Sequence, residues 1–472
     1  MNIALIRPPK ISGAFEKILI QEPINLLYLS AYLQNNGFKV FIWDFEVEPC
    51  TEVIIRQKIK DQDISLAGIT FMTPTVHNAS NVAQLIKKVN PEIKTICGGP
   101  HISALPEDTL QSFPEFDFGI IGEGEISLLA LCRHLKENKP LENIPGIVYK
   151  KDNTVLVNKP GLAISDLDSL PFPDRSLLNR SLYKNIYAAG INMSGKKSTV
   201  LFTSRGCSQD CTFCSVKKTS GPTVRFRSAE NVIRELSECK EKYGYNHITF
   251  EDTNFTLDRK RLFAICDGLK KLKLTWDCQT KVSFVDEEFI KKMAACGCLK
   301  IAYGVESGSP KMLKLMKKNI TLEQVKKAFA LTHKAKIVAC AFFILGTHPE
   351  EKIEDIKMTE ELLREIKPDI FQLGIICPYP GTEIYSIMKK EGMITDLDWS
   401  KFNFMHSTPQ WGTKYIKAAD LTKFQKKIYL RYILSLSFLG WILKKALNPR
   451  ELLHLGKLGV YLLSYLIFEK RT

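Results

Sequence analysis

The sequence contains no uncharged apolar run of the ~20 residues that a membrane-spanning helix needs. The two best candidates, Tyr432–Leu443 and Leu458–Phe468, are both too short. No basic, apolar and small-residue leader follows Met1, and we find no short-period repeat or low-complexity tract. These absences argue against a transmembrane or exported protein. We therefore expect a cytoplasmic protein whose 13 cysteines are reduced.

The composition is that of an ordinary globular protein. The chain has 472 residues, of which 45% are hydrophobic and 25% charged, enough for two or three domains with sizeable cores. Disordered, collagen-like and small disulfide-bonded proteins are excluded. Lys and Arg (66) exceed Asp and Glu (51) by 15, which favours an anionic partner such as nucleic acid, phospholipid or a phosphorylated substrate.

The first 150 residues alternate short apolar runs with amphipathic segments. Runs rich in β-branched residues predict strands, and the segments between them predict helices. This alternation predicts an α/β fold over residues 1–150, a Rossmann-like, doubly wound parallel sheet. The expected strands are Ile3–Ile6, Val40–Trp43, Ser65–Thr70, Thr95–Cys97 and Phe116–Ile121, and the expected helices are Leu26–Asn35, Val53–Lys60, Asn81–Val89 and Ser127–Leu135.

Pro and Gly mark the ends of these expected strands. Ligands of doubly wound sheets bind at the carboxyl ends of the strands. We therefore expect the loops to line one cleft. They are Pro8-Pro9, Thr73-Pro74, Gly98-Gly99-Pro100 and Gly122-Glu123-Gly124-Glu125.

The second half of the chain repeats the alternation after a break. Residues 151–197 include a Pro- and Asp-rich stretch and predict an interdomain linker. Residues 198–400 contain six strand-like pieces that predict a partial (β/α)6 barrel, and residues 401–472 predict a basic helical C-terminal region. The expected barrel strands are Val200–Thr203, His247–Phe250, Thr275–Cys278, Lys300–Val305, Ala339–Leu345 and Ile370–Ile376, with helices at Ser228–Tyr243, Arg259–Leu269 and Leu322–Lys334.

The strongest chemical signal is a group of three cysteines, Cys207, Cys211 and Cys214, spaced C-x3-C-x2-C directly after an expected strand. Three thiolates are one ligand short of closing an iron–sulfur cluster, so one iron stays open to a substrate or cofactor. Structural zinc needs a fourth ligand, and no further Cys or His lies nearby in the sequence. Chance placement or packing is the alternative, and it requires the spacing, the loop and the strand to coincide.

This motif, with the aromatic Phe213 before its last cysteine, resembles the radical S-adenosylmethionine (SAM) superfamily. The resemblance implies that the three cysteines bind a [4Fe-4S] cluster whose open iron is chelated by SAM. It also implies reductive cleavage of SAM to a 5′-deoxyadenosyl radical, which abstracts a hydrogen atom from the substrate. A low-potential flavodoxin or ferredoxin would supply the electrons.

Further segments are similar to SAM contacts of the same superfamily. Glu251-Asp252 resembles the acidic segment that meets the SAM amino group, and Glu306 with Ser307 resembles the ribose contact. The backbone around Phe213 and at Ile344-Leu345 would hold adenine. The segment 346–351 departs from the Gly-x-Pro-Gly-Glu pattern common at that place. Without the cysteines, an acidic pair at a strand end is more often a solvated loop or a helix cap.

The glycine-rich loops and the linker segment Leu167–Pro171 resemble the branch of this superfamily that carries an amino-terminal cobalamin-binding domain. Glycines at strand ends suit the close approach of a flat, bulky ligand or its phosphate-bearing tail. The alternative is a flavodoxin-like sheet whose glycines only form turns. The motif Asp-x-His-x-x-Gly is absent, so no lower axial ligand of cobalt is identified. The expected cobalamin contacts are Thr70, Thr73, Pro74, Gly98, Gly99, His101, Gly122, Glu123 and Gly124.

The C-terminal tail, Lys414–Thr472, carries 12 Lys or Arg against Asp420, Glu451 and Glu469. Basic residues interleaved with aromatic and aliphatic ones are typical of interfacial helices on an anionic membrane. A helical cap that packs its apolar face on the barrel is an equal alternative. Nucleic acid is the weakest of the three interpretations, because no RNA-binding module is recognised.

Taken together, the resemblance implies a cobalamin-dependent radical SAM enzyme. In its methyltransferase form, one SAM methylates cobalamin and a second activates a carbon of a small or lipid-like substrate. Cyclisation, rearrangement or oxidation with the same cofactors is the alternative. A tRNA methylthiotransferase ranks low, because only Cys50, Cys97 and Cys132 precede the motif and no RNA-binding domain follows. A non-catalytic cobalamin or cluster carrier would leave the SAM contacts idle.

Overall fold

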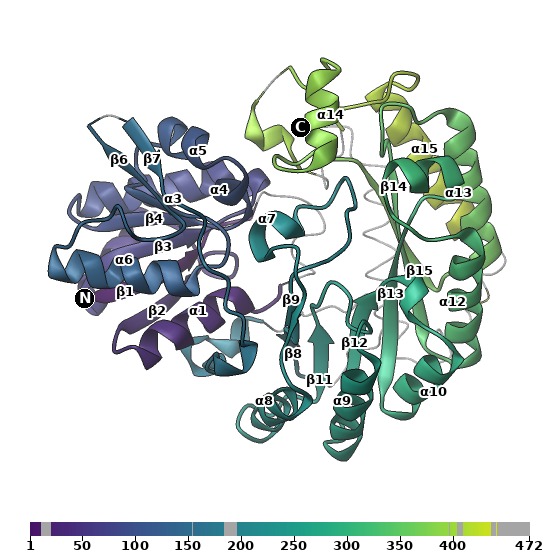
Figure 1. Ribbon diagram of the computed structural model, residues 1–472, viewed down its shortest axis with the longest axis horizontal. Coiled ribbons are helices and arrows are strands. Elements are labelled where there is room, and N and C mark those ends of the chain that lie inside the picture. The colour runs from purple at the N-terminus through teal and green to yellow at the C-terminus, as the bar shows by residue number, and fades with distance from the viewer. Residues whose placement is uncertain are drawn as a thin grey trace.

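The computed structural model describes residues 1–10, 20–152, 154–183, 196–395, 397–403, 409–435 and 440. Two large sheets lie side by side, one built from the first third of the chain and one from the middle (Figure 1). The segment between them carries only short 3-10 turns in its described part, η2 (Leu167–Ser169), η3 (Arg175–Leu177) and η4 (Arg180–Leu182).

The first sheet has seven strands in the order β2-β1-β3-β4-β5-β6-β7. The first five strands are parallel, and β6 and β7 add an antiparallel hairpin at one edge. The hairpin continues this sheet to Val157, inside the predicted linker. The strands are β1 (Asn2–Arg7), β2 (Lys39–Asp44), β3 (Ile64–Thr70), β4 (Lys94–Gly98), β5 (Phe118–Ile120), β6 (Ile147–Lys151) and β7 (Thr154–Val157).

Helices cover both faces of this sheet, which explains why its strands are apolar without alternation. In β1, Ala4 and Ile6 belong to one core with α2 and α3, whereas Ile3 and Leu5 belong to a second core with α1 and α6. The helices are α1 (Ile24–Asn35), α2 (Glu52–Gln62), α3 (Val76–Val89), α4 (Pro100–Ala104), α5 (Pro106–Ser112) and α6 (Glu125–Glu137), and η1 (Thr73–Thr75) precedes α3.

The second sheet is a parallel, six-stranded partial barrel in the order β15-β14-β13-β12-β11-β8. Its helical layer packs on one large core, and the first domain lies on the side of β8 and α7 (Val216–Ser220) (Figure 1). The strands are β8 (Ser198–Leu201), β11 (His247–Phe250), β12 (Thr275–Thr280), β13 (Cys298–Glu306), β14 (Val338–Leu345) and β15 (Ile370–Ile375), and the helices are α8 (Ala229–Glu241), α9 (Arg259–Lys271), α10 (Glu287–Ala295), α11 (Pro310–Leu315), α12 (Leu322–Lys334) and α13 (Ile353–Ile366). The predicted fold class is thereby confirmed.

The chain returns to the first domain after the barrel. Residues of α14 (Glu383–Lys390) and η6 (Trp399–Lys401) share a core with α2 and α3. Trp399, Phe402 and Trp411 are buried there. The sequence gives no sign of this return, because its partners lie some three hundred residues upstream.

The helix α15 (Ala418–Ile433) then packs on the last barrel strand. The ring of Tyr429 stacks on Phe371 with centroids 4.8 Å apart, and the Gln425 amide donates to the Leu373 carbonyl at 2.6 Å. Within the described part of the chain, no helix is long and apolar enough to cross a membrane. The tail segment 441–472, which includes Leu458–Phe468 and the end of Tyr432–Leu443, lies outside the described residues.

Candidate functional site

The three cysteines lie on the loop between the short antiparallel strands β9 (Ser204–Arg205) and β10 (Arg225–Phe226), at the mouth of the barrel. The loop begins at Gly206, whose φ of +91° and close approach to the Thr223 carbonyl leave no room for a Cβ atom. Cys207 is buried, Cys211 partly buried and Cys214 exposed, and all three thiols are free. The helix α7 (Val216–Ser220) follows directly.

Buried hydroxyls and a carboxylate fix the start of this loop. Asp252 is buried and accepts hydrogen bonds from the Thr203 amide at 3.1 Å and the Thr203 hydroxyl at 2.8 Å, and a further one from the Ser204 hydroxyl. It therefore supports the strand that leads into the cysteines. The resemblance implied a SAM contact for Asp252, yet this residue lines neither of the two cavities described below.

The donor set of the loop suits an iron–sulfur cluster with one open iron, because three free thiols lie on one loop. Burial raises the pKa of the Cys211 and Cys214 thiols, and the ammonium of Lys318 opposes that rise. Positive charge therefore already faces the thiols. Among the described residues, no three His, Cys, Asp or Glu side chains form a ready-made metal site.

A cavity of about 260 Å³ lies beside this loop at the carboxyl ends of β13–β15. The predicted SAM contacts Phe213, Glu306 and Ile344 all line it. Glu306 has a φ of +67°, and its carboxylate pairs with Lys318 at 2.7 Å. The further lining residues are Phe342, Phe343, Gln372, Gly374, Ile375, Ile376, Cys377 and Tyr379.

Ser307 and Leu345, the other predicted SAM contacts on these strands, do not line this cavity. Ser307 is buried, and its hydroxyl bonds to that of Thr359 at 3.2 Å. Leu345 lies in the core under the helical layer, because strand residues alternate between the two faces and Ile344 takes the inner one. Of these two adjacent pairs, only Glu306 and Ile344 therefore line the cavity.

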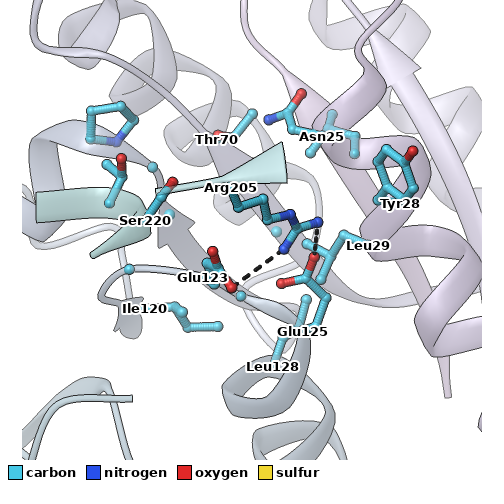
Figure 2. A pocket seen from close by; sticks show the side chains of 18 of the residues that line it. Asn25, Tyr28, Leu29, Thr70, Ile120, Glu123, Glu125, Leu128, Arg205 and Ser220 are labelled. Atoms are coloured by element: carbon cyan, nitrogen blue, oxygen red, sulfur yellow. Dashed lines mark hydrogen bonds and ion pairs between the residues drawn. The ribbon is translucent and has the colours of Figure 1, made fainter. Parts of the chain in front are cut away.

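A larger cavity of about 440 Å³ lies between the two domains (Figure 2). The carboxyl ends of β3 and β4 and the loop after β5 form one wall, and the segment around Arg205 forms the other. In a sheet of this strand order, the junction of β1 and β3 is the topological switch point where ligands bind. The predicted cobalamin contacts Thr70, Gly98, Gly99, Gly122, Glu123 and Gly124 all line the cavity, and so does Glu251.

The glycine wall fits a flat ligand. A Cβ atom on Gly98 would meet nothing within 4 Å, so this backbone faces open space. Gly99 has a φ of +104°, and a Cβ there would lie 2.6 Å from the Phe71 carbonyl oxygen. Leu29, Ile120 and Leu128 add apolar side chains (Figure 2). Backbone without side chains beside an apolar surface suits the edge and face of a corrin ring.

The other predicted cobalamin contacts, Thr73, Pro74 and His101, do not line the cavity. His101 is buried, and its Nδ1 lies 3.1 Å from the Thr73 hydroxyl. Its ring meets Trp399 at 5.1 Å between centroids. Burial lowers the pKa of His101 to about 4, so the imidazole is neutral. The returning C-terminal segment covers this histidine with Trp399, a contact that no sequence pattern indicates.

Arginines of the barrel half close one side of the large cavity. Arg205 bonds to Glu125 at 2.7 Å and lies 3.4 Å from Glu123 (Figure 2). Arg225 also holds Glu123, with one contact at 2.9 Å. The sequence indicates no role for these arginines or for Tyr28 and Asn25 of α1, because no motif links them to their distant partners.

The fold and the site define a cobalamin-binding domain joined to a radical SAM barrel, and comparison with known proteins agrees. A model of the radical SAM superfamily matches residues 201–363, and a model of the B12 binding domain matches residues 19–132. The chain belongs to the cobalamin-binding radical SAM family. It is a radical SAM enzyme that uses a [4Fe-4S] cluster, SAM and cobalamin.

Two relatives and one solved structure match nearly the whole length of the chain. The uncharacterized methyltransferase PH0819 of Pyrococcus horikoshii is 31% identical over 95% of this chain and 97% of its own. The anaerobic magnesium-protoporphyrin IX monomethyl ester cyclase of Rubrivivax gelatinosus is 27% identical over 98% of this chain and 83% of its own. The structure of the cobalamin-dependent enzyme OxsB with aqua-cobalamin and S-adenosylmethionine bound shares the fold, with a TM-score of 0.76 at 19% identity over 99% of this chain and 72% of that one.

Proposed function

We propose that this enzyme methylates an unactivated carbon of a small or lipid-like substrate. One observation carries the proposal: the cysteine loop separates the two cavities. Gly206 and Ser220 line the large cavity, whereas Phe213 of the same loop lines the small one. A cofactor that carries a methyl group and a cofactor that generates a radical would therefore both lie against one loop. The full-length methyltransferase relative supports this assignment.

The roles of the residues follow from their places. Cys207, Cys211 and Cys214 would hold the cluster, Phe213, Ile344 and Glu306 would hold SAM, and the glycine wall would hold cobalamin. When bound, these groups supply one-electron cleavage of SAM and a transferable methyl group. The chain itself would orient the cluster, SAM and cobalamin and set the distances between them.

The inner face of the barrel differs in character between its two halves. On β11–β13 this face is charged, since Asp277 lies 2.9 Å from His247 and 3.5 Å from Lys300. On β14 it is apolar, with Phe342 and Ile344. Asp277 and His247 are buried and line neither cavity, whereas Phe342 and Ile344 line the small one, so a lipid-like chain would lie along β14.

The exposed face of α15 supports membrane contact. Lys423, Lys427, Leu430 and Leu434 follow one another at helical spacing on one side of the helix. Leu430 is 48% exposed and Leu434 is 65% exposed. Basic residues followed by apolar ones fit a helix that lies on an anionic membrane, from which a lipid-like substrate would enter.

Sedimentation with phosphatidylglycerol vesicles tests the membrane contact. We expect a variant with Leu430→Glu and Leu434→Glu to sediment less than the wild type, and neither protein to sediment with phosphatidylcholine vesicles. Leu162→Glu is the control, because Leu162 is also 65% exposed but lies far from α15 in the sequence. Equal sedimentation of all three proteins would contradict the contact.

The reaction itself is tested under anaerobic conditions with the full chain, reconstituted with iron, sulfide and hydroxocobalamin. A low-potential flavodoxin or ferredoxin supplies electrons, and SAM carries a labelled methyl group. We expect the label to move into an organic acceptor taken from a lipid extract, and Cys214→Ala to abolish this transfer. Accumulation of 5′-deoxyadenosine without label transfer would instead indicate cyclisation, rearrangement or oxidation. Absence of bound cobalamin would overturn the assignment of the large cavity.

A further inference from the structure

Lys281 is a buried lysine at the end of β12, directly beside the cysteine loop. The residue is only 7% exposed. Its ammonium donates to the side-chain oxygen of Gln209, which lies between Cys207 and Cys211, at 2.6 Å. This contact places the positive charge of Lys281 beside the middle of the cysteine motif.

No carboxylate among the described residues lies within ion-pair distance of Lys281. Burial lowers the pKa of this ammonium and Lys318 lowers it further, whereas Cys211 and Cys207 raise it. The two cysteines are therefore the groups that would supply negative charge to Lys281 once they bind a cluster as thiolates. An isolated buried charge is costly, and a protein keeps one where a bound group or an anion compensates it.

Lys318 faces the same loop but is differently placed. Its ammonium pairs with Glu306 at 2.7 Å, so a carboxylate already balances its charge. It also lies 5.8 Å from the centre of the Phe213 ring. Lys281 has no such carboxylate among the described residues; besides Gln209, its ammonium lies 5.6 Å from the centre of the Phe284 ring.

We propose that Lys281 is the counter-ion of the cysteine thiolates and, through them, holds the bound cluster at a less negative reduction potential. The proposal rests on the cluster ligands assigned above. A nearby positive charge stabilises the reduced cluster, which carries one more negative charge than the oxidised one. Lys281 is thus a positioning residue that acts on the cluster electrostatically and need not touch the substrate.

The test compares variants that separate charge from structure. Lys281→Met removes the charge, Lys281→Gln removes the charge but keeps a hydrogen-bonding group, and Lys281→Arg keeps the charge. Gln209→Ala removes the hydrogen bond and leaves the ammonium. Lys317→Met is the surface control, since Lys317 is half exposed and already paired with Glu383 at 2.7 Å.

Each full-length protein is reconstituted anaerobically, its iron and sulfide content is measured, and its midpoint potential is read by electron paramagnetic resonance without SAM. We expect Lys281→Met and Lys281→Gln to shift the potential to more negative values, and the other three variants to match the wild type. If Lys281→Met takes up no cluster while Lys281→Arg does, the charge is needed for assembly, which supports the proposal. A wild-type potential in Lys281→Gln, or a shift as large in Gln209→Ala, would overturn it.

A different result is expected if the three cysteines do not bind a cluster. In that case the wild type holds no more iron and sulfide than Cys214→Ala, whatever residue 281 is. The iron content therefore reports on the cysteines, and the potential reports on Lys281.

Discussion

Arg205 of the barrel half donates to Glu125 of the first domain at 2.7 Å, and this pair spans the wall of the large cavity. Glu125 is the first residue of α6. Arg205 is separated from Cys207 only by Gly206. Together with the pairs that Glu123 forms with Arg205 and Arg225, this ion pair connects the start of the cysteine loop to the first domain.

Removing this arginine should loosen the interface. In Arg205→Met, Glu123 keeps Arg225, but Glu125, whose side chain is only 6% exposed, loses its cation. Breaking a buried pair in this way costs about 3 kcal/mol. We expect urea denaturation to report that loss and absorbance to report lower cobalamin occupancy. Arg56→Met is the control: its pair with Glu52 is exposed and should contribute at most about 1 kcal/mol. Equal losses in both variants would argue against the bridge.

Adding a side chain at two adjacent glycines should affect the stability of the protein differently. Gly99→Ala places a Cβ 2.6 Å from the Phe71 carbonyl oxygen at a positive φ, so we expect it to lower stability by about 1–3 kcal/mol. Gly98→Leu meets no neighbour at its Cβ and should leave the melting temperature nearly unchanged. Its side chain would instead occupy the cavity and reduce cobalamin binding. Normal cobalamin binding by a folded Gly98→Leu protein would show that the corrin lies elsewhere.

The sequence predicted the two α/β domains because local apolar periodicity encodes both sheets. The three cysteines could also be identified from the sequence, since all lie within one short loop. The packing of Trp399 on His101 was not, because it joins segments far apart in the chain that share no motif. For the same reason the Arg205 bridge and the lysines around the cluster loop are visible only in three dimensions. The contacts at strand ends were predicted as pairs of adjacent residues. Side chains alternate along a strand, so only one residue of a pair such as Ile344 and Leu345 can face the cavity.

The buried carboxylate of Glu235 on α8 should contribute strongly to the stability of the fold. It accepts from Arg175 of the interdomain segment at 2.9 Å and from the Tyr28 hydroxyl of α1 at 3.0 Å, and Arg227 also pairs with it. Glu235→Gln leaves two buried arginines without their shared anion, which costs about 3–5 kcal/mol. Chemical denaturation measures this cost. Glu238→Gln on the same helix breaks only a surface pair with Lys242 and should change stability by less than about 1 kcal/mol.

A fourth prediction concerns Glu351, a fully buried carboxyl after β14. Its Oε2 accepts from the Thr347 hydroxyl at 2.9 Å, and its Oε1 has no hydrogen-bond partner among the described residues. Burial raises the pKa of Glu351 from an ordinary value of 4.5 to about 7. Between these values the folded protein keeps a proton that the unfolded chain has released.

Stability should therefore fall as the pH rises from 4.5 to about 7, because ionisation favours the unfolded chain. At 1.36 kcal/mol for each pKa unit, the loss is on the order of 3 kcal/mol. Glu351→Gln mimics the neutral carboxyl, so it should lack this decline and exceed the wild type in stability at pH 8. Urea denaturation of both proteins from pH 5 to 8 measures the difference. Parallel curves for the two proteins would mean that Glu351 is ionised in the folded state, and that the segment after β14 holds its charge by some other contact.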